Sequence, residues 1–135
     1  MTHEHSASFA PAIETPAVAR HELESWLPNS LAESDRGALR LLVSELVTNS
    51  VRHAAASASP VGLAVRIASG TIRVEVRDGC NGFDPGTPTP RSGDEPAGYG
   101  GYGLFLVERM ASRWGVERDD GTLVWFELDL APAAG

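Results

Sequence analysis

The chain has 135 residues, which is the length of one ordinary domain and enough to bury a single core. Eleven basic residues against eighteen acidic residues give a formal net charge of −7, and no segment concentrates the basic residues. Such a surface repels a phosphate backbone, so direct nucleic-acid binding is not expected. The single cysteine, Cys80, excludes an internal disulfide, and no apolar stretch approaches the roughly 20 residues that span a bilayer. We therefore expect one cytoplasmic domain that makes no membrane contact.

The N-terminal segment, Met1–Pro16, combines His and Glu with Ala, Ser and Pro. It has no basic patch followed by an apolar run, so it is not a secretory signal. We expect a flexible tail over residues 1–16 and a folded domain over residues 17–131. His3 and His5 could in principle hold a metal, but two histidines in a terminal tail are much more often solvated.

Two amphipathic helices are predicted at the start of the folded part. Apolar residues recur at helical intervals over residues 17–26, which predicts a short first helix. A longer second helix is predicted to begin at Ser34 or Asp35, either of which can cap it, and to end at about Ala55. Its broad apolar stripe consists of Leu39, Leu42, Val43, Leu46 and Val47.

A hairpin and a long loop are predicted next. Val61–Ile67 and Ile72–Val76 each place apolar residues at every second position, which is typical of strands with one buried face. Ser69-Gly70 between them is typical of a hairpin turn. Asp78–Gly101 is rich in glycine and proline and lacks apolar periodicity, so we expect a long irregular loop there.

A third helix and two more strands complete the pattern. The helix is predicted from near Leu104 to near Trp114-Gly115, and the strands at Val116 and over Thr122–Leu130. The order is therefore helix, helix, strand, strand, loop, helix, strand, strand. Helices on one face of a mixed, mostly antiparallel sheet satisfy this order, so we predict an α+β fold, a two-layer α/β sandwich.

Polar side chains form a stripe on the long helix, beside its apolar stripe. Glu45, Asn49 and His53 are spaced four apart and so lie in line along the helix. A solvated helix edge explains any one of them taken alone. An Asn amide oxygen is nevertheless a good ligand for Mg²⁺, which proteins often hold with one or two oxygens plus substrate phosphates. Glu45, one turn from Asn49, is placed to act on a water or a hydroxyl.

Two further segments have the chemistry of a nucleotide site. Asp78 ends a predicted strand, where its carboxylate can accept a hydrogen bond from an exocyclic amine while Gly82 lets a ligand approach the backbone. By itself this segment is better explained as a strand terminator. The run Gly98–Gly103 leads into the third helix and offers free backbone N–H groups to phosphates. It is not a Walker A loop, because no Gly-Lys-Ser/Thr follows.

These motifs occur in one order along the chain, on a helix, at a strand end and at a helix start. They are Glu45-x-x-x-Asn49-x-x-Arg52-His53, Asp78-x-x-x-Gly82-Phe83 and Gly101-x-Gly103-Leu104. The set resembles that of the Bergerat-fold ATPases, which include histidine kinases, Hsp90-like chaperones, type II topoisomerases and small anti-sigma-factor kinases. The chain looks most like an RsbW-type anti-sigma-factor serine/threonine kinase, and the likeness covers roughly residues 17–130.

The resemblance implies that the site holds ATP and Mg²⁺. Asn49 would be the Mg²⁺ ligand, and Glu45 would be the general base that accepts the proton of an attacking hydroxyl. Asp78 would bind the adenine amine, and Arg52 would lie near the phosphates. Thr122 shares a predicted strand face with apolar residues that the helices should cover, so its hydroxyl can point to the adenine end. An ordinary strand position explains Thr122 nearly as well.

The resemblance also implies an ATP lid at about residues 86–100, with Gly101 and Gly103 as its hinge. Gly82 would let the adenine pack against the strand end. The other motif positions are expected to line the nucleotide site: His53, Phe83, Gly98, Gly100, Tyr102 and Leu104.

The implied partners are a small antagonist protein, phosphorylated on serine or threonine, and a sigma factor, so transcription would be regulated by partner switching. A homodimer is left open. Close relatives often carry Arg near the second glycine motif, whereas Tyr99 and Tyr102 stand here and Arg91 is the only basic residue of the predicted lid. The alternative is therefore a non-catalytic, ATP-responsive protein-binding module of the same fold. A bare interaction domain would require all the motifs to be accidental.

Overall fold

The computed structural model describes residues 2–54, 59–79, 101–118 and 121–130. These residues form one sheet with the strand order β1-β2-β3-β5-β4, in which every pairing is antiparallel. The strands are β1 (His3–Phe9), β2 (Val61–Ala68), β3 (Thr71–Asp78), β4 (Arg113–Arg118) and β5 (Thr122–Asp129). The helices are α1 (Thr15–Trp26), α2 (Glu33–Ala54) and α3 (Gly101–Met110).

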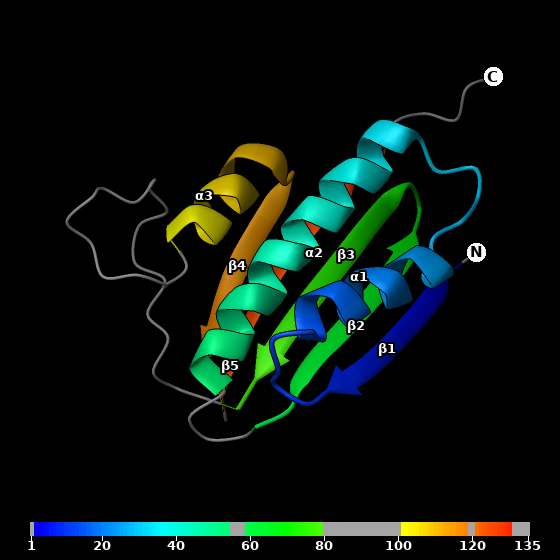
Figure 1. Cartoon of the computed structure of the whole chain (residues 1–135). Coiled ribbons are helices and arrows are strands. Elements are labelled where there is room, and N and C mark those ends of the chain that lie inside the picture. The colour runs from blue at the N-terminus through cyan, green and yellow to red at the C-terminus, as the bar shows by residue number, and fades with distance from the viewer. Residues whose placement is uncertain (1, 55–58, 80–100, 119–120, 131–135) are drawn as a thin grey trace.

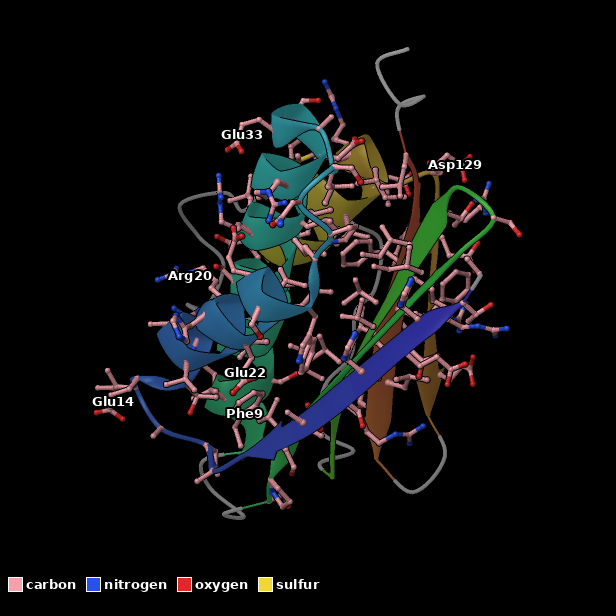
Figure 2. All side chains as sticks on the ribbon, turned by 90° about the vertical axis from the view of Figure 1, so that its right-hand side faces the viewer. Phe9, Glu14, Arg20, Glu22, Glu33 and Asp129 are labelled. Carbon is pink, nitrogen blue, oxygen red and sulfur yellow. The ribbon has the colours of Figure 1, made fainter. Side chains whose placement is uncertain are left out.

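The helices form one layer and the sheet forms the other. All three helices lie on the same face of the sheet (Figure 1), and a view turned by 90° shows the two layers from the side (Figure 2). The predicted α+β two-layer sandwich is confirmed. The other face of the sheet carries no helix in the described part of the chain.

The core lies between α2 and the sheet, and alternation along the strands explains which residues enter it. The predicted α2 stripe is fully confirmed, because none of its five side chains is more than 2% exposed. The inner face of the sheet supplies the matching apolar residues, since successive strand residues point to opposite faces. These are Val61, Leu63, Val65, Ile72, Val74, Val76, Val124, Phe126 and Leu128.

The predicted hairpin between β2 and β3 is also confirmed. Its two turn residues, Ser69 and Gly70, both have positive φ, at 53° and 78°. Two consecutive residues with positive φ match the right-handed twist of the flanking strands, which is why this short turn closes a hairpin.

The expectation of a flexible N-terminal tail is wrong for residues 3–9. They form the edge strand β1, which pairs with β2 from His3 opposite Ile67 to Phe9 opposite Val61. The ring of His5 stacks on the ring of Trp26 in α1, with the ring centroids 5.4 Å apart. The segment contains few apolar residues, so its order depends on long-range pairing that the local pattern does not reveal.

The end of the third helix also differs from the prediction. α3 ends at Met110, and Trp114 and Gly115 belong to β4 and do not terminate the helix. Gly115 lies opposite Trp125 of β5, and a Cβ atom at Gly115 would stand only 2.8 Å from the indole Nε1 of Trp125. The glycine therefore makes room for a ring across the strand pair.

An ion-pair cluster fixes α1 against α2. Glu24 of α1 accepts hydrogen bonds from Arg36 and Arg40 of α2, each at 2.7 Å. The hydrogen bond from Arg40, followed by that from Arg36, lowers the pKa of the Glu24 carboxyl below its ordinary value. Since the folded state binds the proton less tightly than the unfolded chain, this contribution to stability is present near neutral pH and is lost in acid.

We expect the Glu24→Gln variant to lose about 1 kcal/mol of unfolding free energy at pH 7, a modest figure because the carboxylate is partly exposed. The difference in unfolding free energy from the parent should shrink as the pH falls below 4.5, the ordinary pKa of a glutamate, and Glu24 becomes protonated. Urea unfolding of both proteins between neutral and acidic pH measures this. A difference that stays constant down to the acid limit would contradict the assignment.

We expect removal of residues 2–10 to lower the free energy of unfolding by at least about 2 kcal/mol, because it exposes the Trp26 ring and the edge of β2. His5→Ala, which removes only the stacked ring, should give a smaller loss. Urea unfolding followed by tryptophan fluorescence checks both variants. An unchanged midpoint for the deletion would mean that β1 contributes nothing to the sheet.

Candidate functional site

The polar stripe of α2 turns from the protein surface toward the interior. Steps of four residues advance around an α-helix by about 40° beyond a full turn, so such a stripe winds slowly about the axis. Glu45 is half-buried, whereas Asn49, one step further, is only 8% exposed. Arg52 is exposed. His53 lies in α2, but its side chain is outside the described part of the structure.

Asn49 has a buried amide group without a partner. Its Nδ2 is the one buried side-chain nitrogen or oxygen that lacks a hydrogen bond among the described residues. Leaving such a donor unpaired costs about 1–3 kcal/mol. The two ends of an Asn amide are assigned from their surroundings, so a flipped amide would leave the oxygen free instead. In either orientation a polar atom is left for a ligand.

Asp78 and Thr122 form a second buried polar position. Asp78 is the last residue of β3 and is 3% exposed, and Thr122 is the first residue of β5 and is 1% exposed. The two residues are direct partners in the β3–β5 pairing. Thr122 shares the inner face of β5 with Val124 and Phe126, as predicted.

The chain brings the polar positions of α2 and β3 to one end of the molecule. α2 packs on β3. The last residue of α2, Ala54, and the last residue of β3, Asp78, lie at the same end of the fold (Figure 1). α3 packs beside α2 and begins with Gly101 and Gly103. The amide of Asn49 and the carboxylate of Asp78 therefore lie toward one end of the two-layer sandwich, and α3 begins beside α2 (Figure 1).

Sequence reasoning missed two contacts that shape the strand end. A Cβ atom on Gly121 would stand 2.2 Å from the carbonyl oxygen of Asp78, and Gly121 has a φ of 125°. A Cβ atom on Gly79 would stand 3.1 Å from the hydroxyl of Ser59. The chain segments before β2 and before β5 thus press against the end of β3. The local signal for this contact was a glycine directly before the predicted strand over Thr122–Leu130.

Several predicted site residues lie outside the described residues. They are Gly82, Phe83, Gly98 and Gly100, together with the predicted lid at about residues 86–100. Gly101, Tyr102, Gly103 and Leu104 form the start of α3, earlier than the start predicted near Leu104, and their side chains are not described.

An open hollow of about 510 Å³ lies on the face of the sheet without helices, and it is lined by residues such as Ser6, Ala64 and Arg66. None of its lining residues belongs to the predicted site. The described residues contain no group of three His, Cys, Asp or Glu side chains suited to a metal. A cation near Asn49 would therefore need further oxygens from a bound ligand or from water.

Comparison with protein families identifies the chain. Residues 9–128 match the model of the histidine kinase-like ATPase domain. The chain belongs to this family. Membership of an ATPase family implies a site for ATP. The residues at this end of the sandwich fit such a ligand, because the buried Nδ2 of Asn49 has no partner among the described residues.

A solved structure shows the same fold. It is the crystal structure of the RsbU and RsbW domains of Rv1364c from Mycobacterium tuberculosis, with 21% sequence identity and a TM-score of 0.72. The match covers 97% of this chain and 34% of that chain, so the present sequence spans about a third of the longer protein. No curated protein gives a significant match. Among the described residues, no helix has both the length and the apolar character needed to cross a membrane.

We expect Gly121→Ala to lower the free energy of unfolding by about 3 kcal/mol, because the new methyl group would meet the Asp78 carbonyl oxygen and the backbone φ is strained for alanine. Gly70→Ala is the matched control, since its φ is also positive but nothing lies within 4 Å of the added Cβ. That variant should lose only about 1 kcal/mol. Urea unfolding of both variants decides, and equal losses would show that the close approach at Asp78 has no consequence.

Proposed function

We propose that this protein is an ATP-dependent serine/threonine protein kinase of the anti-sigma-factor type. The unpaired buried amide of Asn49, one helical turn from the half-buried Glu45, carries this proposal. A fold of the ATPase family would bind the nucleotide. The Glu45 carboxylate has no partner among the described residues and is available to accept a proton. The solved structure of similar fold contains an RsbW domain, which supports the same class.

Each described residue has a proposed role in binding. Asn49 would hold Mg²⁺ together with phosphate oxygens, and the ion would neutralise charge on the phosphates. Asp78 would accept a hydrogen bond from the adenine amine, with Thr122 beside it. Arg52 is exposed on α2 and would lie near the phosphates. The start of α3 would place backbone N–H groups near the same phosphates.

Glu45 is the proposed general base for phosphoryl transfer. It would accept the proton of a seryl or threonyl hydroxyl while the hydroxyl oxygen forms a bond to the γ-phosphorus. The bond from that phosphorus to the bridging oxygen breaks, and ADP leaves with the bond's electron pair. Such a mechanism depends on positioning and charge neutralisation more than on covalent chemistry of the protein.

The proposed partners are an antagonist protein and a sigma factor in the cytoplasm. The unphosphorylated antagonist would hold the kinase, and its phosphorylation would free the kinase to bind and silence the sigma factor. Transcription would then respond to the phosphorylation state of the antagonist.

A second candidate is an ATP-responsive binding module without phosphoryl transfer. One observation favours it: Tyr99 and Tyr102 stand near the second glycine motif, and Arg91 is the one basic residue in the predicted lid. A terminal phosphate without a nearby cation loses much of its transition-state stabilisation, whereas ATP binding through Asn49 and Asp78 does not require that cation.

We expect Asn49→Ala and Asp78→Asn each to weaken Mg-ATP binding by about tenfold or more, because each removes a buried polar partner of the nucleotide. Asn29→Ala, in the turn between α1 and α2, and Asp129→Asn, at the far end of β5, are the matched controls. Isothermal titration with Mg-ATP measures all five proteins. A parent protein that binds no ATP would contradict both candidate functions.

We expect Glu45→Gln to lower the rate of phosphoryl transfer by about a hundredfold or more and to leave ATP affinity nearly unchanged, because a positioned base acts mainly in the chemical step. The assay incubates the protein, γ-labelled ATP and small proteins of the antagonist class and follows label in the acceptor. Tight ATP binding without transfer, unaffected by the Glu45 substitution, would select the non-catalytic module.

A further inference from the structure

Ser50 continues the core-facing stripe of α2 as a polar residue. It lies four residues after Leu46 and three after Val47, so its side chain points between theirs, toward the sheet. The two apolar residues are 2% and 0% exposed, and Ser50 itself is 5% exposed. The helix therefore places a hydroxyl, instead of an apolar group, at the interface between the two layers.

The hydroxyl of Ser50 has no hydrogen-bond partner among the described residues. Two other hydroxyls of the same helix are bonded: Ser44 accepts a hydrogen bond of 3.1 Å from Arg20 of α1, and Thr48 donates one of 2.6 Å to the Ser44 carbonyl oxygen. Ser50 makes no such bond to the carbonyl oxygen four residues earlier, nor to any other residue that the structure describes. A buried hydroxyl without a partner costs free energy that an alanine at the same place would not cost.

The Ser50 hydroxyl is accessible from outside the core. In the described part of the chain, Nδ2 of Asn49 is the one fully enclosed polar side-chain atom without a hydrogen bond. The unbonded oxygen of Ser50 is therefore not enclosed, and it belongs to the 5% of the residue that remains exposed. A ligand atom or a water can reach this oxygen without opening the core.

The place of Ser50 in the fold relates it to Asp78. α2 packs on β3, and both elements end at the same end of the fold (Figure 1). Ser50 lies one turn before the last residue of α2, and Asp78 is the last residue of β3. Asp78 shares the inner face of the sheet with Val74 and Val76, because alternate residues of a strand point to the same face. The hydroxyl and the carboxylate thus lie toward the same end of the interface between the layers, whereas Asn49 points about 100° away around the helix.

We infer that the Ser50 hydroxyl is a further binding group for the nucleotide base, an inference that rests on the ATP binding of the proposed function. It donates a hydrogen bond to a ring nitrogen of the base, while Asp78 accepts one from the exocyclic amine. The ligand class is therefore a 6-aminopurine, which offers an amine donor and ring acceptors together. Hypoxanthine and guanine carry a carbonyl in place of that amine, so their nucleotides would set an acceptor against the Asp78 carboxylate.

The test compares Mg-ATP with the magnesium complexes of 1-deaza-, 3-deaza- and 7-deaza-ATP, each of which has a C–H group in place of one ring nitrogen. Isothermal titration measures the affinity of the parent, Ser50→Ala and Ser44→Ala. Ser44 is the matched control, because it is a serine of the same helix whose hydroxyl is already bonded to Arg20. We expect Ser50→Ala to bind ATP about fivefold more weakly than the parent, and Ser44→Ala to match the parent.

One of the three analogues should abolish the difference between the parent and Ser50→Ala. With that analogue the parent should lose the same factor in affinity and Ser50→Ala should lose nothing more, because the nitrogen that the hydroxyl bonds is absent. Without nucleotide, Ser50→Ala should unfold at the same urea concentration as the parent or at a higher one, because the unpaired hydroxyl is gone and alanine favours a helix.

The results separate this inference from the proposed function. Equal ATP affinity of the parent and Ser50→Ala would overturn the inference and leave the ATP site standing. A deficit of Ser50→Ala that is the same with ATP and with all three analogues would also overturn it, because the loss would then come from a change of shape. Lower stability of Ser50→Ala would show that the hydroxyl is bonded within the fold, which again contradicts the inference. A parent that binds no ATP would contradict the proposed function, and the inference with it.

Discussion

The burial of the α2 apolar stripe against the sheet is the constraint on which the rest of the molecule depends. Leu39, Leu42 and Val43 have no exposed surface, and Leu46 and Val47 have almost none. Rotating the helix to improve any polar contact would expose these side chains, each worth about 1.5–3 kcal/mol when fully buried. The core thereby fixes the direction of Asn49, whose unpaired amide is tolerable only because the core holds the helix in place.

The same constraint divides α2 into surfaces with different tasks. One side binds the sheet, a second side is fixed to α1 by the arginines around Glu24, and a third contacts α3. The polar stripe winds around the helix from one of these sides to another, because each step of four residues advances about 40° beyond a full turn. One helix can therefore carry a half-buried carboxylate and a buried amide one turn apart.

The sequence predicted those elements whose secondary structure is determined by their own residues and near neighbours. The α2 stripe and the β2–β3 alternation are strong periodic signals, and Ser69-Gly70 defines its turn by its own backbone preference. β1 was missed because its order comes from β2, far along the chain, and from Trp26. Gly115 was mistaken for a helix stop because the sequence alone does not distinguish a glycine that makes room for a ring on the next strand from a glycine that ends a helix.

The candidate site was predictable in part for a related reason. The spacing of Glu45 and Asn49 on a helix can be read from the sequence, and Asp78 and Thr122 fall at strand ends that alternation predicts. Their pairing, and the close approach of Gly121 and Ser59 to the end of β3, depend on how separate segments meet in space. No local pattern encodes such meetings, since the residues involved are small and chemically ordinary.

The position of β1 has a consequence for how the fold opens. It has a strand on one side only, whereas β3 lies between β2 and β5. Its partner β2 is separated from it along the chain by both α1 and α2. Closing that long loop costs entropy, which is offset by one row of hydrogen bonds, the His5–Trp26 ring pair, the Glu4–Arg66 ion pair and the packing of Phe9 on the core. Backbone amide hydrogens of β1 should accordingly exchange with solvent through a local opening, whereas those of β3 should exchange only when the whole domain unfolds.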